Sequence, residues 1–147
     1  MRDISAVLLT SSGFLVLLIG LLCGAPMGRA INQGQAEDII RAWRVAHSSL
    51  VGGGVMLLAI SANLSRVELP ATAMLLVSGA LCVSVWAFTF ALIFGAWNGH
   101  RGTDRGAGTG SALTYAANMT GVILSVVAIT GLSYGACVHL LRALSVI

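Results

Sequence analysis

Four long apolar stretches alternate with short polar segments along the chain. The apolar stretches cover residues 6–25, 45–64, 71–97 and 111–141. Each reaches the length of about 20 residues that an α-helix needs to cross the hydrocarbon core of a bilayer. The pattern therefore predicts an all-α membrane protein, a bundle of four transmembrane helices that forms a single domain over residues 1–147.

The polar segments predict how these helices are connected. Pro26 is expected to end the first helix, and a polar stretch over residues 28–35 follows it. A charged segment over residues 36–44, which we expect to be helical, leads into the second apolar stretch. Pro70 suits the first position of the third helix, and a Gly-rich loop over residues 98–110 precedes the fourth. The first stretch is longer than the apolar part of a signal peptide, so we expect it to be retained.

The composition agrees with lipid as the solvent. Hydrophobic residues make up 57% of the chain, charged residues 9%, and the mean hydropathy is +0.94. A soluble domain carries about 25% charged residues, because its surface faces water. The net charge is only +3, and the arginines are scattered rather than clustered as a nucleic-acid surface requires. We therefore expect a multi-pass membrane protein, surrounded by lipid and without a nucleic-acid partner. We expect its membrane to be a bacterial inner membrane.

His47 stands out among the few ionisable side chains in the apolar stretches. An ionisable group at membrane depth costs free energy and is a functional candidate. Three glycines, residues 52–54, follow it, and Gly54 lies on the same helical face. A neutral imidazole beside space left by glycines suits an axial ligand of haem, whose propionates Arg41 and Arg44 could meet. The alternative is a histidine hydrogen-bonded at a helix interface.

The beginning of the second apolar stretch resembles a known family. Residues 42–48, Ala-Trp-Arg-Val-Ala-His-Ser, with the Gly-rich helix after them and Pro70, resemble the second span of styrene oxide isomerases. Trp86, Phe94 and the pair at residues 101–102 fall in similar register without gaps. The organisation is also similar to that of hydroxylaminobenzene mutases, small membrane enzymes with a comparable histidine near the start of the second span.

The resemblance implies a cofactor, an assembly and a reaction. Styrene oxide isomerases are homotrimers of four-helix subunits that bind haem b near subunit interfaces through the motif histidine. Ferric iron acts as a Lewis acid on the epoxide oxygen, a hydride shifts, and an aldehyde leaves without net redox change. The resemblance thus implies a homotrimer with haem b, and iron bound by the histidine. The expected cofactor-binding residues are His47, Trp43, Arg44, Arg41, Gly54 and Arg101.

Three positions depart from the isomerase pattern. The isomerases have Asn six residues after the motif histidine, Asp two residues before the matching Trp, and Tyr six residues after that Trp. This chain has Gly53, Ser84 and Leu92 at those places. Since the three polar residues help to hold and orient the epoxide, the resemblance covers the scaffold and the haem ligand better than the substrate site.

Other residues are candidates for the missing polar contacts. Tyr115 and Asn118, near the start of the fourth stretch, are the candidate catalytic residues, with Trp86 and Phe90 as aromatic walls. Asn118 at membrane depth needs a hydrogen-bond partner, which a neighbouring helix could equally supply. Arg101 could close the pocket or bind a propionate, or it could be a solvated loop charge.

Two enzymatic functions and one non-catalytic function stay open. The first is a haem-dependent isomerase that converts an epoxide to a carbonyl in a small hydrophobic substrate, and the second moves a hydroxyl group from nitrogen to a ring carbon. The third is a haem-binding membrane subunit. A cytochrome with two axial histidines is disfavoured, because His100 lies in a loop and His139 lies near the end of the fourth stretch. Ion transport is disfavoured because no charged residue lies well inside a span.

Overall fold

The computed structural model describes residues 2–99 and 108–145, and these residues form helices joined by short non-helical segments, without strands. The elements are α1 (Arg2–Leu22), α2 (Gly24–Asn32), α3 (Glu37–Asn63), the short 3-10 helix η1 (Leu64–Arg66), α4 (Ala71–Asn98) and α5 (Thr109–Leu144). Four spans are long and apolar enough to cross a membrane: Asp3–Asn32, Glu37–Arg66, Ala71–Asn98 and Thr109–Leu144. The prediction of an all-α protein with four membrane helices is confirmed.

The first span differs from its predicted form, because the chain stays helical beyond Pro26. The helix is interrupted at Cys23 and resumes as α2, which continues to Asn32. A proline has no N–H to donate, so it is tolerated in the first turn of a helix, where that donor is not needed. Pro26 therefore marks a break near the start of α2 and not the end of the span. Pro70 similarly precedes α4 as its N-terminal cap.

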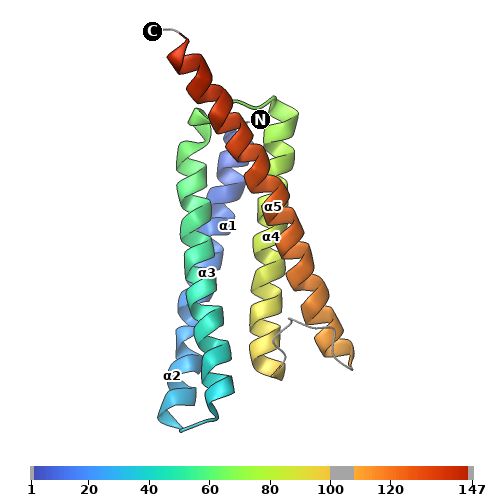
Figure 1. Ribbon diagram of the computed structural model, residues 1–147. Helices are drawn as coiled ribbons and strands as arrows, with labels where there is room; N and C mark the ends of the chain where they lie inside the picture. The colour runs from blue at the N-terminus through green and yellow to red at the C-terminus, as the bar shows by residue number, and fades with distance from the viewer. Residues whose placement is uncertain (1, 100–107, 146–147) are drawn as a thin grey trace.

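The helices associate as two pairs, as Figure 1 shows. α3 lies along α1, α5 lies along α4, and contacts of α4 with α1 and α3 join the pairs. α5 has 36 residues and is therefore about 54 Å long, more than a bilayer of about 30 Å requires, and it runs obliquely across α4 (Figure 1). The apolar core between the helices is formed by Leu9, Val16, Leu50, Leu57, Met74, Leu81 and Ala128.

Glycines allow the backbones of α1 and α3 to touch. A Cβ atom on Gly54 would lie 2.7 Å from the backbone N of Leu17 and 2.8 Å from the carbonyl O of Gly13. A Cβ atom on Gly20 would lie 2.7 Å from the backbone N of Val51. Real side chains do not approach backbone atoms so closely, so these positions require glycine. Close backbone packing of this kind is typical of membrane helices, where small residues replace the hydrophobic effect as the source of association.

Hydroxyl groups add bonds between the same two helices. Ser61 Oγ donates to the carbonyl O of Ala6 at 3.0 Å, and the hydroxyl groups of Thr10 and Ser61 are 2.7 Å apart. Because the single hydroxyl proton of Ser61 is donated to the carbonyl O of Ala6, Thr10 is the donor in the second bond. Each such bond in a membrane contributes about 0.6 kcal/mol on average, so glycine packing and hydroxyl bonds together hold α1 on α3.

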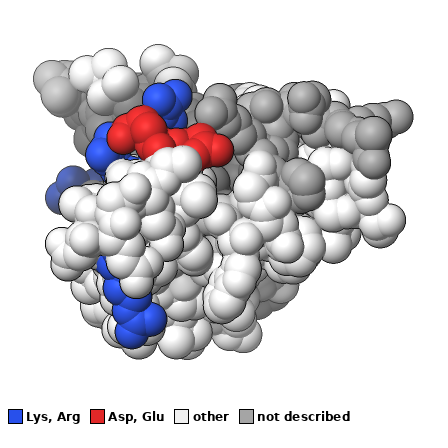
Figure 2. Space-filling view, turned by 90° about the horizontal axis from the view of Figure 1, so that it is seen from below, with Lys and Arg blue, Asp and Glu red and all other residues white. Residues whose placement is uncertain are grey.

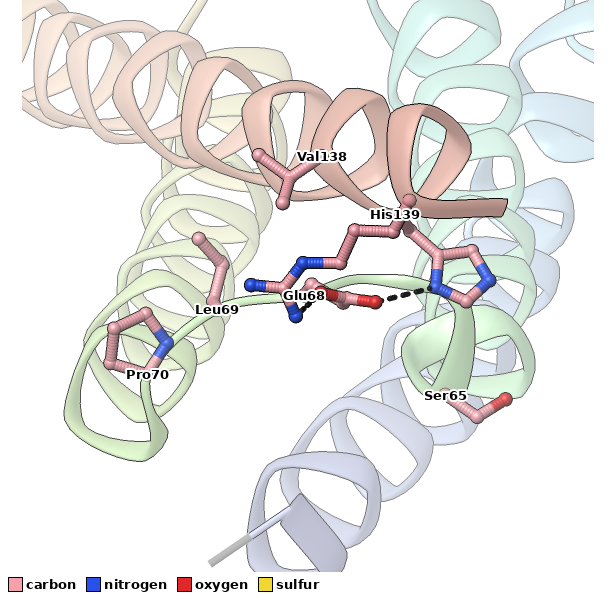
Figure 3. Close-up of a pocket in the computed structure, with 7 residues that line it drawn as sticks. Ser65, Glu68, Leu69, Pro70, Val138 and His139 are labelled. Carbon is pink, nitrogen blue, oxygen red and sulfur yellow. Dashed lines mark hydrogen bonds and ion pairs between the residues drawn. The ribbon is translucent and has the colours of Figure 1, made fainter. Parts of the chain in front are cut away.

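The connection between α3 and α4 is attached to the C-terminal part of α5 through Glu68 (Figure 3). The Glu68 backbone N–H donates to the carbonyl O of Gly135 at 3.1 Å, and Glu68 Oε1 is 3.1 Å from His139 Nδ1. The other carboxylate oxygen pairs with Arg142. A Cβ atom on Gly135 would lie 2.6 Å from Val67 Cγ1, so the absence of a side chain at this position leaves room for the connection between α3 and α4. The contact ties the end of α5 to the α1–α3 pair.

We expect Glu68→Gln to lower the free energy of unfolding by about 1 kcal/mol, because it leaves Arg142 without its anionic partner. The Glu68 side chain is 25% exposed and Arg142 is 72% exposed, so solvent screens the pair in part and the expected effect stays small. Glu37→Gln is the matched control, since Glu37 and Arg44 lie 3.9 Å apart with side chains 62% and 57% exposed. Denaturation in mixed detergent micelles measures both variants. Equal stability of the two would contradict a stabilising role for Glu68.

Candidate functional site

The His47 side chain, on α3, is turned toward α1. His47 Nδ1 lies 2.8 Å from the carbonyl O of Gly20, and the ring is partly buried. A carbonyl oxygen only accepts hydrogen bonds, so in the neutral ring Nδ1 carries the proton and Nε2 keeps its lone pair. Histidines that bind metals typically donate their other ring N–H to a carbonyl or carboxylate in this way. The arrangement therefore fits a metal-ligating imidazole.

A metal at His47 would need further ligands from a prosthetic group. Over residues 2–99 and 108–145 the structure contains no group of three or more His, Cys, Asp or Glu side chains that could hold a metal ion together. A porphyrin supplies the equatorial nitrogens itself and asks the protein for axial ligation only. The donor set in the described part of the chain thus fits haem better than a bare ion.

The three glycines after His47 have different surroundings. Gly54 lies on the face of α3 that meets α1, as His47 does, but the backbone of α1 fills the space beside it. Gly54 therefore serves helix packing, and its cofactor-binding role stays a prediction. A Cβ atom on Gly53 would lie 3.6 Å from Val85 Cγ2, whereas one on Gly52 would meet no atom within 4 Å. The space left open by the glycines lies beside Gly52.

Trp43, one turn before His47, connects α3 to the end of α4. Its ring centroid is 6.3 Å from that of Trp97, in an edge-to-face arrangement with an interplanar angle of 63°. Both rings line a cavity of about 340 Å³ between the beginning of α3 and the end of α4. α3 is therefore anchored at this level on both neighbours, by His47 on α1 and by Trp43 on α4.

The outer face of α4 carries an aromatic groove, which we define by the residues Trp86, Thr89, Phe90, Ile93, Phe94, Trp97 and Asn98. The groove is an open depression with a volume of about 490 Å³. Phe90 and Phe94 stack with ring centroids 5.2 Å apart and an interplanar angle of 15°. Trp97 also lines the cavity that contains Trp43, so the two cavities share a wall. The predicted aromatic walls, Trp86 and Phe90, thus belong to one surface that leads toward the His47 end of α3.

The predicted arginines lie at the α2 end of the bundle. Arg44 is exposed and pairs with Glu37 at 3.9 Å, and Arg41 is exposed as well. Figure 2, which looks onto this end, shows acidic side chains beside basic ones, and most of the other described residues in the view are neither acidic nor basic. Arg101 and His100 lie outside the described residues.

Tyr115 and Asn118 belong to the other helix pair. Both are partly buried in the first turns of α5, and each interacts with another group in the structure. α5 packs along α4, whereas the ring of His47 is turned toward α1. Within one subunit, Tyr115 and Asn118 thus lie in the α4–α5 pair, whereas His47 lies in the α1–α3 pair.

The positions that depart from the isomerase pattern serve packing. Ser84 is buried and its hydroxyl group donates to the carbonyl O of Gly121 at 2.7 Å, which joins α4 to α5. Gly53 faces Val85, and Leu92 packs against the apolar core. None of the three side chains therefore offers a free polar group to a substrate.

Two groups of the site were missed by sequence reasoning. The carbonyl of Gly20 is a backbone atom on a distant helix, and residue types carry no signal for it. Trp97 could have been found, because Trp86, Phe90, Phe94 and Trp97 follow one another at helical spacing on one face of α4. The aromatic groove was thus predictable over its whole length, whereas the partner of His47 was not.

Four apolar helices and a partly buried histidine whose second ring nitrogen is available define a multi-pass membrane protein with a candidate metal-ligating site. The family model for styrene oxide isomerase matches residues 5–137, which include parts of all four spans. The chain belongs to the styrene oxide isomerase family, and this membership indicates an isomerase. No curated protein matched the chain.

Proposed function

We propose that this protein is a haem-b-dependent membrane isomerase that converts an epoxide to a carbonyl compound in a small hydrophobic substrate. The observation that supports it is the hydrogen bond between His47 Nδ1 and the carbonyl O of Gly20, which leaves Nε2 as the ligand atom. It occurs in a chain of the styrene oxide isomerase family. When bound, haem iron supplies a Lewis acid that polarises the substrate oxygen.

The residues around His47 have complementary roles in this proposal. His47 holds the iron, and Arg41 and Arg44 bind the propionates near the membrane surface, where guanidinium groups pair well with carboxylates. Trp43 packs on Trp97 and closes the site toward α4. Arg101 remains a candidate for a further propionate contact.

The aromatic groove on α4 is the proposed substrate site. Its walls are apolar rings, and the Thr89 hydroxyl already donates to the carbonyl O of Val85 at 2.8 Å. Such a surface would bind the aromatic ring of a substrate through apolar and stacking contacts. Tyr115 and Asn118 are the proposed catalytic contacts to the substrate oxygen, supplied by a neighbouring subunit of the proposed trimer, because within one subunit they lie on the other helix pair from His47.

The proposed assembly is a homotrimer in a bacterial inner membrane. Trp86, Phe90 and Trp97 are 38%, 43% and 78% exposed in one subunit. A second subunit would cover this surface. Chemical crosslinking in membranes is expected to give a trimer band, and a chain that crosslinks only as a monomer would contradict the assembly.

A second reaction is favoured by the packing roles of Gly53, Ser84 and Leu92. The family positions that orient an epoxide have no free polar group in this protein. A hydroxylaminobenzene-mutase-like reaction, in which a hydroxyl group moves from nitrogen to a ring carbon, would use the same metal with different polar contacts. The two reactions share the scaffold and differ in the substrate.

Absorption spectroscopy combined with product analysis tests the proposal. The protein purified in detergent is expected to show a Soret band and to convert styrene oxide to phenylacetaldehyde. Formation of 2-aminophenol from phenylhydroxylamine, without phenylacetaldehyde, would select the second reaction. A Soret band with neither product would indicate a non-catalytic haem-binding subunit, and the absence of a Soret band would overturn the haem assignment.

Phe90→Ala tests the substrate groove. We expect it to raise KM for an aromatic substrate about 3- to 10-fold with little change in kcat, because a stacking contact contributes about 0.5–1.5 kcal/mol to uniform binding. Leu76→Ala is the control, since Leu76 is 73% exposed on the same helix and lies outside the groove. Steady-state kinetics measures both. An unchanged KM for Phe90→Ala would place the substrate elsewhere.

A further inference from the structure

The hydrogen bond to His47 is built into a backbone contact that only glycine permits. His47 Nδ1 is 2.8 Å from the carbonyl O of Gly20. A Cβ atom on Gly20 would lie 2.7 Å from the backbone N of Val51 and 3.0 Å from the carbonyl C of Leu50. Both are backbone atoms of α3, so no flexible side chain could give way. Any side chain at position 20 would push α1 from α3 and separate the carbonyl from the imidazole.

A second glycine lies against the same ring. A Cβ atom on Gly24 would lie 3.5 Å from His47 Nδ1 and 3.6 Å from Cε1, which is ordinary contact distance. Gly20 and Gly24 are on opposite sides of the helix break at Cys23. The imidazole is thus held at Nδ1 by the carbonyl of one glycine while its edge faces the other, which limits rotation about the side-chain torsions.

We propose that the backbone carbonyl of Gly20 is a positioning group that fixes the tautomer and orientation of His47. A neutral imidazole in water favours the proton on Nε2, which would block that nitrogen as a ligand. The carbonyl reverses the preference, because it accepts only from a protonated Nδ1. The same bond increases the basicity of Nε2 toward iron. This inference rests on the proposed function, in which His47 is the haem ligand.

Gly20→Ala and two control variants test this role in the full-length protein. Gly13→Ala disturbs the same α1–α3 interface, because its Cβ would lie 3.0 Å from the Leu58 side chain and 3.1 Å from the carbonyl O of Gly54, away from His47. Gly52→Ala meets no atom within 4 Å and controls for the helix propensity of alanine. The measurements are haem dissociation, the reduction potential of the iron, and the iron–histidine vibration by resonance Raman spectroscopy.

Gly20→Ala is expected to weaken haem binding about 10- to 100-fold, to raise the reduction potential and to lower the iron–histidine frequency. Gly13→Ala and Gly52→Ala are expected to leave the potential and the frequency at their wild-type values. If Gly20 had only a general packing role, Gly13→Ala and Gly20→Ala would change the reduction potential and the iron–histidine frequency alike. That result would overturn the proposal, as would a Gly20→Ala variant with wild-type spectra.

Nitrogen NMR of histidine-labelled wild-type protein from haem-starved cells separates this inference from the proposed function. His47 is expected to carry its proton on Nδ1 without any haem, and His47→Ala assigns the signal. A proton on Nε2 would overturn the positioning role even if haem binds. If no haem binds in any preparation, the proposed function fails, while a proton on Nδ1 would still support the tautomer set by Gly20.

Discussion

Replacement of His47 by alanine is expected to remove the Soret band of the purified protein and its isomerase activity. His47 Nε2 is the nitrogen left available by the bond to Gly20, and the described residues offer no cluster of ligands to replace it. A bound Lewis acid contributes several kcal/mol of charge stabilisation, so its loss lowers the rate by about 10³-fold or more. Absorption spectra and product formation, compared with the wild-type protein, measure the two effects.

The control for this variant is His139→Ala, because His139 lies near the far end of α5 and bonds Glu68. It is expected to keep the Soret band. Imidazole added to the His47→Ala protein should occupy the space of the lost ring and restore part of the band, which distinguishes a missing ligand from a misfolded chain. A full Soret band in His47→Ala without added imidazole would contradict the assignment of His47 as the ligand.

The four spans were predictable because each is long, apolar and bounded by polar residues. The exact end of the first span was not, since Pro26 is compatible with either a helix end or the first turn of a new helix. The structure shows the second case, with a break at Cys23 and continuation to Asn32. Local residue types do not distinguish the two, because the outcome depends on the packing of α2 against α3.

The site was predictable only where it depends on side chains of one helix. His47 was found as a polar group in an apolar stretch, and its shared face with Gly54 follows from helical spacing. What lies opposite that face does not follow from spacing. The backbone of α1 fills the space beside Gly54, whereas the space beside Gly52 is open. Contacts between distant helices decide which glycine leaves space, and residue types alone carry little information about them.

His47 and Trp43 together explain why α3 is suited to carry the site. One turn apart, they contact different helices, His47 the carbonyl of Gly20 on α1 and Trp43 the ring of Trp97 on α4. α3 thus bridges the two helix pairs at the α2 end, while Glu68 bridges them at the other end. The imidazole on this helix is thus held directly by α1 and indirectly, through Trp43, by α4.

Gly54→Ala is expected to destabilise the protein by about 2 kcal/mol, the usual cost of forcing a methyl group into a closed contact. The new Cβ atom would lie 2.7 Å from the backbone N of Leu17 and 2.8 Å from the carbonyl O of Gly13, so α1 and α3 must separate. Gly52→Ala, two residues earlier on the same helix, meets no atom within 4 Å and is expected to be neutral or stabilising.

Unfolding in mixed detergent micelles measures both variants. Gly54→Val, with a larger side chain at the same contact, should be less stable still. If Gly54→Ala were as stable as Gly52→Ala, the close backbone contact between α1 and α3 would not be what holds these two helices together.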